Sequence, residues 1–148
     1  MAAPAATAPD LLILLAQVKQ ALHEEMSAAL TELGISPRAH CVLARAAEGG
    51  QTQSRLAERT ALDKTTMVVT VDELERAGLA ERRTSSTDRR ARIIEVTPEG
   101  ERLVAKGQEI VSRVYDDVLS SIPQDERDLL VAALERLAEG SRQRSTTK

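Results

Sequence analysis

The stretch RRTSSTDRRARIIEVTPEG, residues 82–100, combines arginines, small polar residues and a β-branched run. With the residues just before it, it contains two extended candidates, LAERR and RIIEV, separated by the polar segment TSSTDR. That pattern predicts a β-hairpin with a long polar tip, and the Ile and Val residues favour its second strand. Thr97, Pro98 and Glu99 then supply a cap, a first-turn proline and an acid near the positive end of a helix dipole. The hairpin is therefore expected to lead directly into a helix.

The predicted hairpin is basic, although the whole chain is acidic. From Leu79 to Arg92 it carries five arginines against Glu81 and Asp88, a net charge of +3 within a chain of formal charge −3, so the remainder carries −6. A basic finger on an acidic body favours phosphate contact at one place over general solvation. The candidate DNA contacts in it are Arg82, Arg83, Arg89 and Arg90.

The tip of the hairpin is built from small residues around one acid. Ser and Thr keep it slim enough for a DNA minor groove about 6 Å wide, where an arginine reads the negative potential of a narrowed A/T-rich groove. Asp88, a lone carboxylate among arginines, is expected to pair with one of them and hold the loop in shape. The alternative is an ordinary charged surface hairpin.

Four helices are expected before the hairpin. Asp10, Ser36 and Asp63 are the expected N-caps of the first, second and fourth, and Gly34 is the expected stop of the first. Apolar residues at spacings of three and four support the first and fourth helices, and Pro37 with the Gly49–Gly50 pair marks the ends of the second. The predicted ranges are 10–33, about 37–48, the segment SRLAERTAL at 54–62, and 63–77.

The fourth helix is the candidate recognition helix. Its apolar side, formed by Met67, Val71 and Leu74, is expected to face the core. The residues left facing outward are Lys64, Thr65, Val68, Val69 and Asp72. Hydroxyl groups reach base edges and methyl groups contact thymine, so this face suits a DNA major groove. The alternative is that Val68 and Val69 complete the core of a small domain.

Two helices are expected after the hairpin. The first runs from Thr97 to about Ser120, and the second lies in SIPQDERDLLVAALERLAEG, residues 121–140, with Gly140 as its terminator. Residues 141–148 are expected to be a frayed basic tail, and residues 1–9 a disordered lead. The order of elements predicts a mainly α winged helix-turn-helix, in which a β-hairpin wing follows two short helices.

Composition excludes several classes of function. Tyr115 is the only aromatic residue, which argues against gripping single-stranded nucleic acid by base stacking. The single cysteine permits no intrachain disulfide or thiolate zinc cluster and fits a reducing cytoplasm. No segment is long enough to span a membrane. A phosphate-binding glycine loop, an HExxH motif and a nucleophile elbow are all absent from the sequence, so we expect no enzyme and no cofactor.

The remaining titratable candidates are three isolated side chains. Cys41 lies mid-helix beside apolar residues, so a buried packing role is favoured over oxidant sensing. His23 and His40 lack other ligands at metal-binding spacing, so satisfied or surface imidazoles are favoured and no metal is expected.

The segment DRRARIIEVTPEG, residues 88–100, resembles the signature of MarR-family transcriptional regulators: Asp-x-Arg, a hydrophobic strand, then Leu/Val-Thr-x-x-Gly. Residues 53–83 are similar to the helix-turn-helix of that family, and the resemblance covers about residues 10–140. It implies that Arg90 enters the minor groove and that Asp88 organises the wing. It further implies a structural hinge at Thr97 and Gly100, major-groove positions at Lys64, Thr65, Thr66 and Val68, and phosphate contacts at Gln53 and Ser54.

The resemblance also implies partners. Family members are homodimers, which here assigns residues 10–35 and 98–140 to dimerisation and residues 36–97 to the winged DNA-binding domain. The apolar stripes of the long helices agree, because one small winged domain does not cover them. The resemblance implies a repressor of a pseudo-palindromic duplex site, controlled by a lipophilic or phenolic effector. The alternative is a winged-helix module that docks another protein through helix 63–77 and binds no DNA.

Overall fold

The computed structural model describes residues 10–146. The predicted lead at residues 1–9 lies outside the described residues, as do residues 147 and 148. The chain divides into two compact units, which join in the sequence between Val114 and Tyr115. The first unit holds everything expected to meet DNA.

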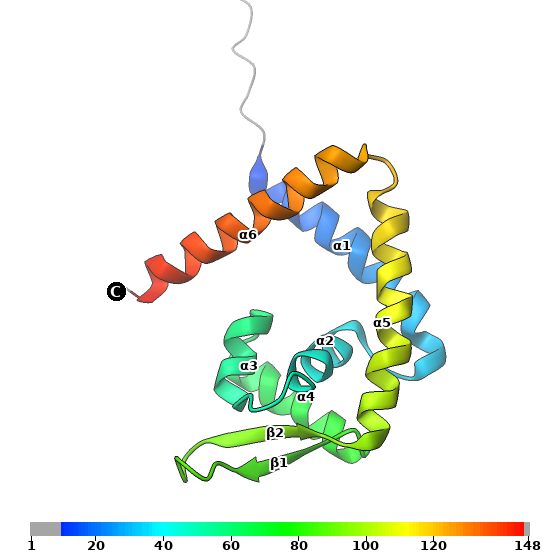
Figure 1. The fold of residues 1–148 in the computed structure, drawn as a ribbon. Helices are drawn as coiled ribbons and strands as arrows, with labels where there is room; N and C mark the ends of the chain where they lie inside the picture. Colours follow the sequence, from blue (N-terminus) through cyan, green and yellow to red (C-terminus); the bar gives the residue numbers. More distant parts are fainter. Residues whose placement is uncertain (1–9, 147–148) are drawn as a thin grey trace, which may run out of the picture. The chain divides into compact units, whose positions relative to one another are not determined.

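The elements follow the predicted order of four helices, a hairpin and two helices (Figure 1). This confirms the mainly α winged helix-turn-helix. The helices are α1 (Leu11–Leu30), a short 3₁₀ turn η1 (Thr31–Leu33), α2 (Pro37–Ala46), α3 (Gln53–Thr60), α4 (Lys64–Arg76), α5 (Pro98–Leu119) and α6 (Gln124–Thr146), and the strands are β1 (Ala80–Thr84) and β2 (Arg92–Val96).

The predicted helix starts are confirmed by their capping hydrogen bonds. The Asp10 carboxylate accepts from two backbone N–H groups of α1, and the Ser36 hydroxyl accepts from the third residue of α2. The Asp63 carboxylate accepts the Thr66 N–H at 2.8 Å at the start of α4. Gly34, with φ of 65°, ends the first helical segment as expected. Local sequence alone therefore sets these boundaries.

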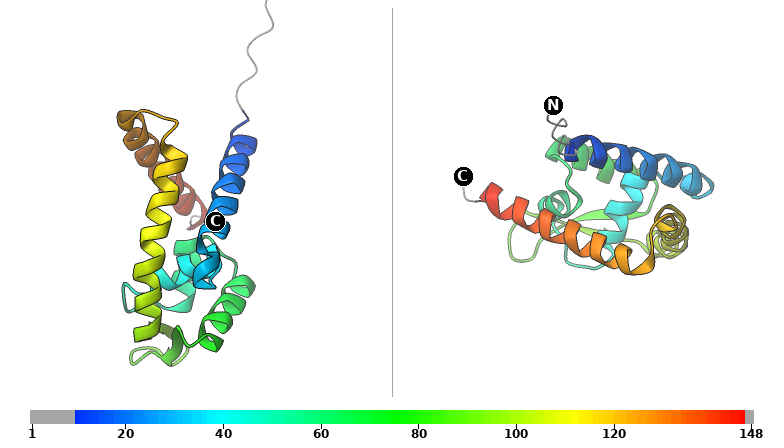
Figure 2. Two further views of the ribbon diagram at one scale, coloured as in Figure 1. Left: turned by 90° about the vertical axis from the view of Figure 1, so that its right-hand side faces the viewer. Right: turned by 90° about the horizontal axis from the view of Figure 1, so that it is seen from above.

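The core of the first unit lies between α2, α3 and α4. Leu43, Leu56 and Met67 bring one fully buried side chain from each of the three helices. Ile94 of β2 closes the core from the side of the hairpin. Most of α1, by contrast, stands clear of these short helices (Figure 2), and its only fully buried residue is Leu30.

The hairpin is antiparallel, with Ala80 opposite Val96 at its base and Thr84 opposite Arg92 toward its tip. A short segment before α3 adds to its other edge. The Ile94 N–H donates to the Gln51 carbonyl at 3.0 Å, and Thr52 bridges to Ile93. The sequence pattern did not predict that this segment pairs with β2, because it is too short to show the alternation of a strand.

The wing joins α5 through a close backbone contact. The Thr97 hydroxyl donates to the Gly78 carbonyl at 2.7 Å and accepts the Gly100 N–H at 3.1 Å. A Cβ added at Gly100 would overlap the Leu79 carbonyl oxygen and press on Val96. The absence of a side chain at this glycine therefore allows α5 to start directly against the hairpin.

The expected end of the last helix is wrong. Gly140 does not terminate α6, which continues to Thr146 through most of the predicted tail. Gly140 is not among the residues with positive φ, and the Ser141 hydroxyl donates to the Leu137 carbonyl across it. A glycine inside a helix costs only about 1 kcal/mol, and the surrounding Ala, Glu, Arg and Gln residues favour helix.

Within residues 10–146, no helix combines the length and the apolar character that crossing a membrane requires.

Candidate nucleic-acid interface

The tip of the wing is a tight turn that displays two arginines. The Ala91 N–H donates to the Asp88 carbonyl at 3.1 Å, which makes Arg89 and Arg90 the two central residues of a four-residue turn. Both arginines are exposed. No hydrogen bond or ion pair from either guanidinium is present among the described residues. Their charges are therefore available to a partner.

Asp88 organises this turn, but not by the expected ion pair. Its carboxylate accepts the backbone N–H of Arg90 at 2.9 Å, and it makes no ion pair within residues 10–146. Aspartate commonly closes a turn in this way, by accepting from the backbone two residues further on. The expected pairing with an arginine is thus corrected: the carboxylate fixes the backbone and leaves the guanidinium of Arg90 free.

Ser85 supports the tip from inside. It is buried, and its hydroxyl accepts the backbone N–H groups of Thr87 and Asp88, both at 3.3 Å. Its own N–H donates to the Ala91 carbonyl at 3.2 Å. The sequence pointed to slimness as the purpose of the small residues. The structure shows a second role, because the Ser85 hydroxyl holds the backbone of the turn. The residue type alone did not predict these hydrogen bonds.

The other arginines of the wing have partners. Arg83 pairs with Glu81 on its own strand and with Glu95 on β2, and it remains half exposed. Arg92 donates to the Arg89 carbonyl at 3.0 Å and so supports the turn at the tip. The free cationic groups of the hairpin are therefore concentrated at its end.

Arg82 departs most from expectation. It was predicted to contact DNA, but its guanidinium is directed to Asp72 at 2.7 Å and Glu75 at 2.6 Å, both on α4. It also donates to the Gln53 side chain at 3.0 Å, and its side chain is only 22% exposed. These partners reach Arg82 from other elements, so the charge count of the hairpin alone did not show them.

The outer face of α4 is open, as predicted. Val68 is 41% and Val69 44% exposed, while Met67, Val71 and Leu74 are buried. The alternative that the two valines complete the core is therefore wrong. Lys64 and Thr65 at the start of the helix are exposed as well.

Thr66 is more constrained than its neighbours in the predicted recognition set. Its backbone N–H and its hydroxyl both donate to the Asp63 carboxylate, each at 2.8 Å. These two bonds hold the pKa of Asp63 below its ordinary value, the backbone bond contributing most. The hydroxyl of Thr66 thus fixes the start of α4, and Thr65 is left with the freer hydroxyl.

The first residue of α3, Gln53, contacts the wing. Gln53 is half-buried and its side-chain oxygen accepts from Arg82, whereas Ser54 is exposed. Because a guanidinium only donates, the Gln53 oxygen must face it, and the amide NH₂ group points elsewhere. Arg82 therefore links β1 to the start of α3 and to α4, and the hairpin extends from this region to its tip (Figure 1).

Two of the isolated titratable residues differ from expectation. Cys41 is exposed, not packed in the core, because it shares the outer face of α2 with Arg38 and Arg45. Partial desolvation raises the pKa of its thiol, against the weaker opposite effect of Arg45, so thiolate formation is disfavoured. His23 is exposed, as expected. Within residues 10–146 no group of three His, Cys, Asp or Glu side chains is placed to hold a metal ion.

His40 is buried and only partly satisfied, so the expectation of a satisfied or surface imidazole is wrong. It is 4% exposed, its Nε2 has no hydrogen-bond partner, and it packs against Gly107 of α5. Desolvation lowers its pKa, and a hydrogen bond to the Val104 backbone opposes that shift only in part. A neutral buried histidine therefore lies where α2 meets α5.

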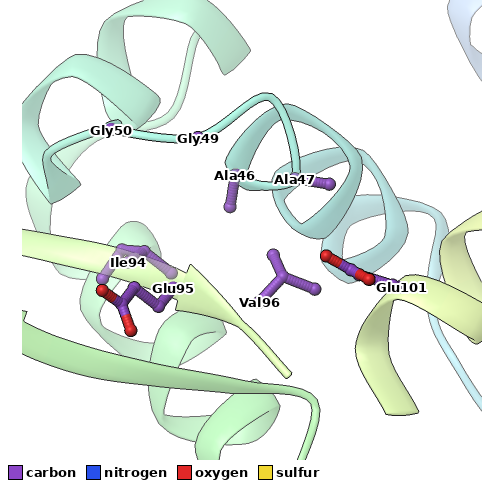
Figure 3. A pocket seen from close by; sticks show the side chains of 8 residues that line it. All are labelled: Ala46, Ala47, Gly49, Gly50, Ile94, Glu95, Val96 and Glu101. Carbon is purple, nitrogen blue, oxygen red and sulfur yellow. The ribbon is translucent and has the colours of Figure 1, made fainter. Parts of the chain in front are cut away.

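A small open pocket of about 290 Å³ lies at the base of the wing (Figure 3). It is lined by the end of α2, the Gly49–Gly50 turn, β2 and the start of α5. Its ionisable side chains are Glu95 and Glu101, so its charge disfavours phosphate or a carboxylate ligand. The pocket is thus separate in character from the basic tip.

These features define a class of protein: a winged helix-turn-helix with an open face on its fourth helix and a basic wing tip whose turn is hydrogen-bonded. Comparison with known proteins agrees. Residues 33–91, from the end of the first helical segment to the wing tip, match the model of the MarR family.

Solved structures extend the match to nearly the whole chain. CouR from Rhodococcus jostii RHA1, bound to p-coumaroyl-CoA, is 30% identical, with 87% of this chain and 92% of that chain covered and a TM-score of 0.79. A MarR-family transcriptional regulator from Rhodococcus sp. RHA1 is 29% identical, with 92% and 96% covered and a TM-score of 0.83. The Mycobacterium tuberculosis MarR-family protein Rv2887, in complex with salicylic acid, is 25% identical, with 90% and 99% covered and a TM-score of 0.72.

The chain belongs to the MarR family of winged-helix, DNA-binding transcriptional regulators. That family consists of regulators and not of enzymes, in agreement with the motifs missing from the sequence.

Proposed function

We propose that this protein is a homodimeric repressor that binds a pseudo-palindromic site in double-stranded DNA and is controlled by a small lipophilic or phenolic effector. The observation that carries the proposal is the pair of free arginines on a hydrogen-bonded turn at the wing tip, together with the exposed methyl and hydroxyl groups of α4. The positive charge at the wing tip suits the minor groove of a duplex, and the short side chains of α4 suit the major groove.

Each part of the interface has its own role in the proposal. Arg90, with Arg89 beside it, enters the minor groove at the tip. Arg83 is half exposed beside Glu81 and Glu95, and it is the proposed phosphate contact on the strand. Lys64, Thr65 and Val68 meet the major groove, with Thr66 holding the start of that helix. Ser54 and the amide NH₂ group of Gln53 donate to phosphate at the start of α3.

Exposed apolar side chains support the homodimer. In the single chain, α1 exposes Leu12 at 79% and Leu11 at 65%, and α6 has no buried residue and exposes Leu129 at 68%. Apolar surface of this kind is normally covered by a partner. A twofold dimer would place two recognition helices on half-sites about 34–36 Å apart, one turn of DNA.

The ligands of two similar proteins support the class of effector. CouR is bound to p-coumaroyl-CoA and Rv2887 to salicylic acid, and both ligands contain a phenol. An effector of this class needs to shift the balance between DNA-binding and non-binding forms by only about 1 to 3 kcal/mol. The acidic pocket at the wing base is a poor site for an anionic phenolic acid, so we do not place the effector there.

Selection of genomic fragments with the purified protein tests this function. The recovered duplexes should contain a pseudo-palindrome, and affinity for them should fall steeply as salt rises, because several phosphates are contacted. Repeating the selection with phenolic acids tests the effector. Failure to enrich any duplex, or affinity indifferent to salt, would instead favour a protein-docking module that uses Val68 and Val69.

A further inference from the structure

Arg82 joins three elements of the interface. Its backbone N–H donates to Glu75 at 2.8 Å, and its guanidinium bonds Asp72 and Glu75 through Nη1. The Nη2 group donates to the Val68 carbonyl at 3.2 Å, and Nε donates to the Gln53 side chain at 3.0 Å. All three guanidinium nitrogens are therefore engaged, and they tie β1 to α4 and to the start of α3.

These contacts fall on the groups proposed to meet DNA. Val68 presents its side chain outward while its carbonyl is held by Arg82. Gln53 turns its oxygen to Arg82, which leaves its NH₂ group as the end directed elsewhere. A planar guanidinium with fixed donor directions is suited to setting such positions, because its geometry is rigid.

The net negative charge of Arg82, Asp72 and Glu75 together is unfavourable for DNA binding. Another role, such as holding the interface in place, is needed to explain the two acids. Two carboxylates around one guanidinium carry a net negative charge beside a surface that has to approach phosphate. Long-range electrostatics alone would favour removal of either acid. The low exposure of Arg82 also leaves little of its charge for a phosphate.

We propose that Arg82 is a positioning residue for DNA recognition. Through Asp72 and Glu75 it fixes the wing relative to the recognition helix, so that these two acids strengthen binding to the specific site. This inference rests on the proposed function, since it concerns how the same interface reads its DNA.

The test compares acids on one helix. Glu75→Ala removes both bonds that Glu75 accepts from Arg82, whereas Glu73→Ala removes an adjacent acid that pairs only weakly with Arg38, at 3.6 Å. Both changes remove one negative charge from α4 and place a good helix former there. Affinity is measured by titration against a selected duplex and a scrambled duplex of equal length, at several salt concentrations.

The expected results differ in sign. Glu75→Ala should lower affinity for the selected duplex about tenfold, the loss of roughly one good base contact, and should leave scrambled-duplex affinity the same or higher. Glu73→Ala should leave both affinities the same or slightly higher. A role in fold stability alone would not change the ratio of the two affinities in the folded protein. An unchanged or increased ratio in Glu75→Ala would overturn the proposal.

A second variant separates positioning from direct phosphate contact. Arg82→Lys keeps the positive charge but loses the planar guanidinium with its several donors. A positioning role therefore predicts a loss of affinity for the selected duplex comparable to that of Glu75→Ala. Arg82→Gln should leave the salt dependence of binding as in the parent. If Arg82→Lys binds like the parent, or Arg82→Gln reduces the slope of log affinity against log salt by about one, Arg82 is a phosphate contact and the proposal is wrong. If the parent protein binds no duplex, the proposed function itself is wrong. That result is distinct from the outcomes above, which concern Arg82 alone.

Discussion

The two ends of the wing use the same residue type in opposite ways. At the base, Arg82 is surrounded by acceptors from α4 and α3 and is mostly covered. At the tip, Arg90 has its backbone fixed by Asp88 and its guanidinium left free. The comparison shows that a cluster of arginines on a hairpin is not one cationic surface. Partners outside the hairpin decide which guanidinium groups are engaged and which stay free.

The difference has a physical basis in where acids lie. The base passes alongside α4, which carries acids at positions facing β1, whereas the tip extends beyond that helix (Figure 1). A guanidinium with carboxylates within reach pairs with them, and one without them remains hydrated and available to phosphate. The wing therefore has a base packed against α4 and an end whose guanidinium groups have no partner among residues 10–146.

The largest effect should come from breaking the packed base at Gly100. In Gly100→Ala the new Cβ overlaps the Leu79 carbonyl oxygen, a backbone atom that cannot rotate away. We expect the free energy of unfolding to fall by about 3 kcal/mol, at the upper end of overpacking costs. Chemical denaturation measures this.

The matched control is Gly140→Ala, the same change inside α6. There the nearest atom is the end of the flexible Arg144 side chain, at 3.3 Å. We expect this variant to be as stable as the parent or more stable by up to about 1 kcal/mol, because alanine favours helix. Equal stabilities for the two variants would contradict the close contact at the wing base.

The next effect concerns the free end of the wing. Arg90→Ala should weaken binding to A/T-flanked sites by about 1 to 3 kcal/mol, since it removes one groove contact, and should leave dimerisation and stability unchanged. Arg113→Ala, at an exposed position of α5, controls for the loss of one positive charge. Equal affinities of Arg90→Ala and the parent for the selected duplex would refute the role assigned to the tip.

The same comparison explains what the sequence could and could not predict. Helix starts such as Asp63 were predictable because a cap acts on residues two or three positions away. The exposure of Val68 and Val69 followed from helical periodicity. The partners of Arg82 were not predictable, since they depend on how β1 and α4 lie against each other, and no local pattern encodes that arrangement.

Two further errors have the same origin in weak local signals. The sequence predicts a helix end at Gly140 because glycine often terminates helices. That ending needs a left-handed backbone at the glycine, which Gly140 does not have, and α6 continues. The sequence favours a satisfied or exposed His40, but this side chain packs against Gly107 of α5, which buries it, and its Nε2 has no partner.

Acid should destabilise the fold through the buried His40, where α2 meets α5. Burial lowers the pKa of His40 in the folded protein, so the unfolded chain binds a proton first as pH falls. Stability is therefore fully present above the ordinary range of histidine and is lost as pH falls from that range toward the lowered folded pKa. One such group contributes at most about 1.4 kcal/mol per pH unit.

Thermal unfolding between pH 7.5 and 5.5 checks this, with the parent compared with His40→Gln. The variant should lose less stability on acidification than the parent, whatever its stability at neutral pH. The same substitution at exposed His23 controls for the loss of an imidazole. Parallel pH profiles for the parent and His40→Gln would show that His40 does not carry the effect.

The smallest effect should come from the turn that presents Arg90. Asp88→Ala removes the acceptor for the Arg90 N–H and loosens the tip, so affinity for the selected duplex should fall by about 1 kcal/mol, the net value of one hydrogen bond. Loss of a negative charge near phosphate would by itself act in the opposite direction. Asp88→Asn separates the two effects, because it keeps an acceptor and removes the charge. Affinity in the order Asp88→Asn, parent, Asp88→Ala, from tightest to weakest, would establish that the acid at the tip acts through the backbone, whereas a gain in both variants would show that its charge alone matters.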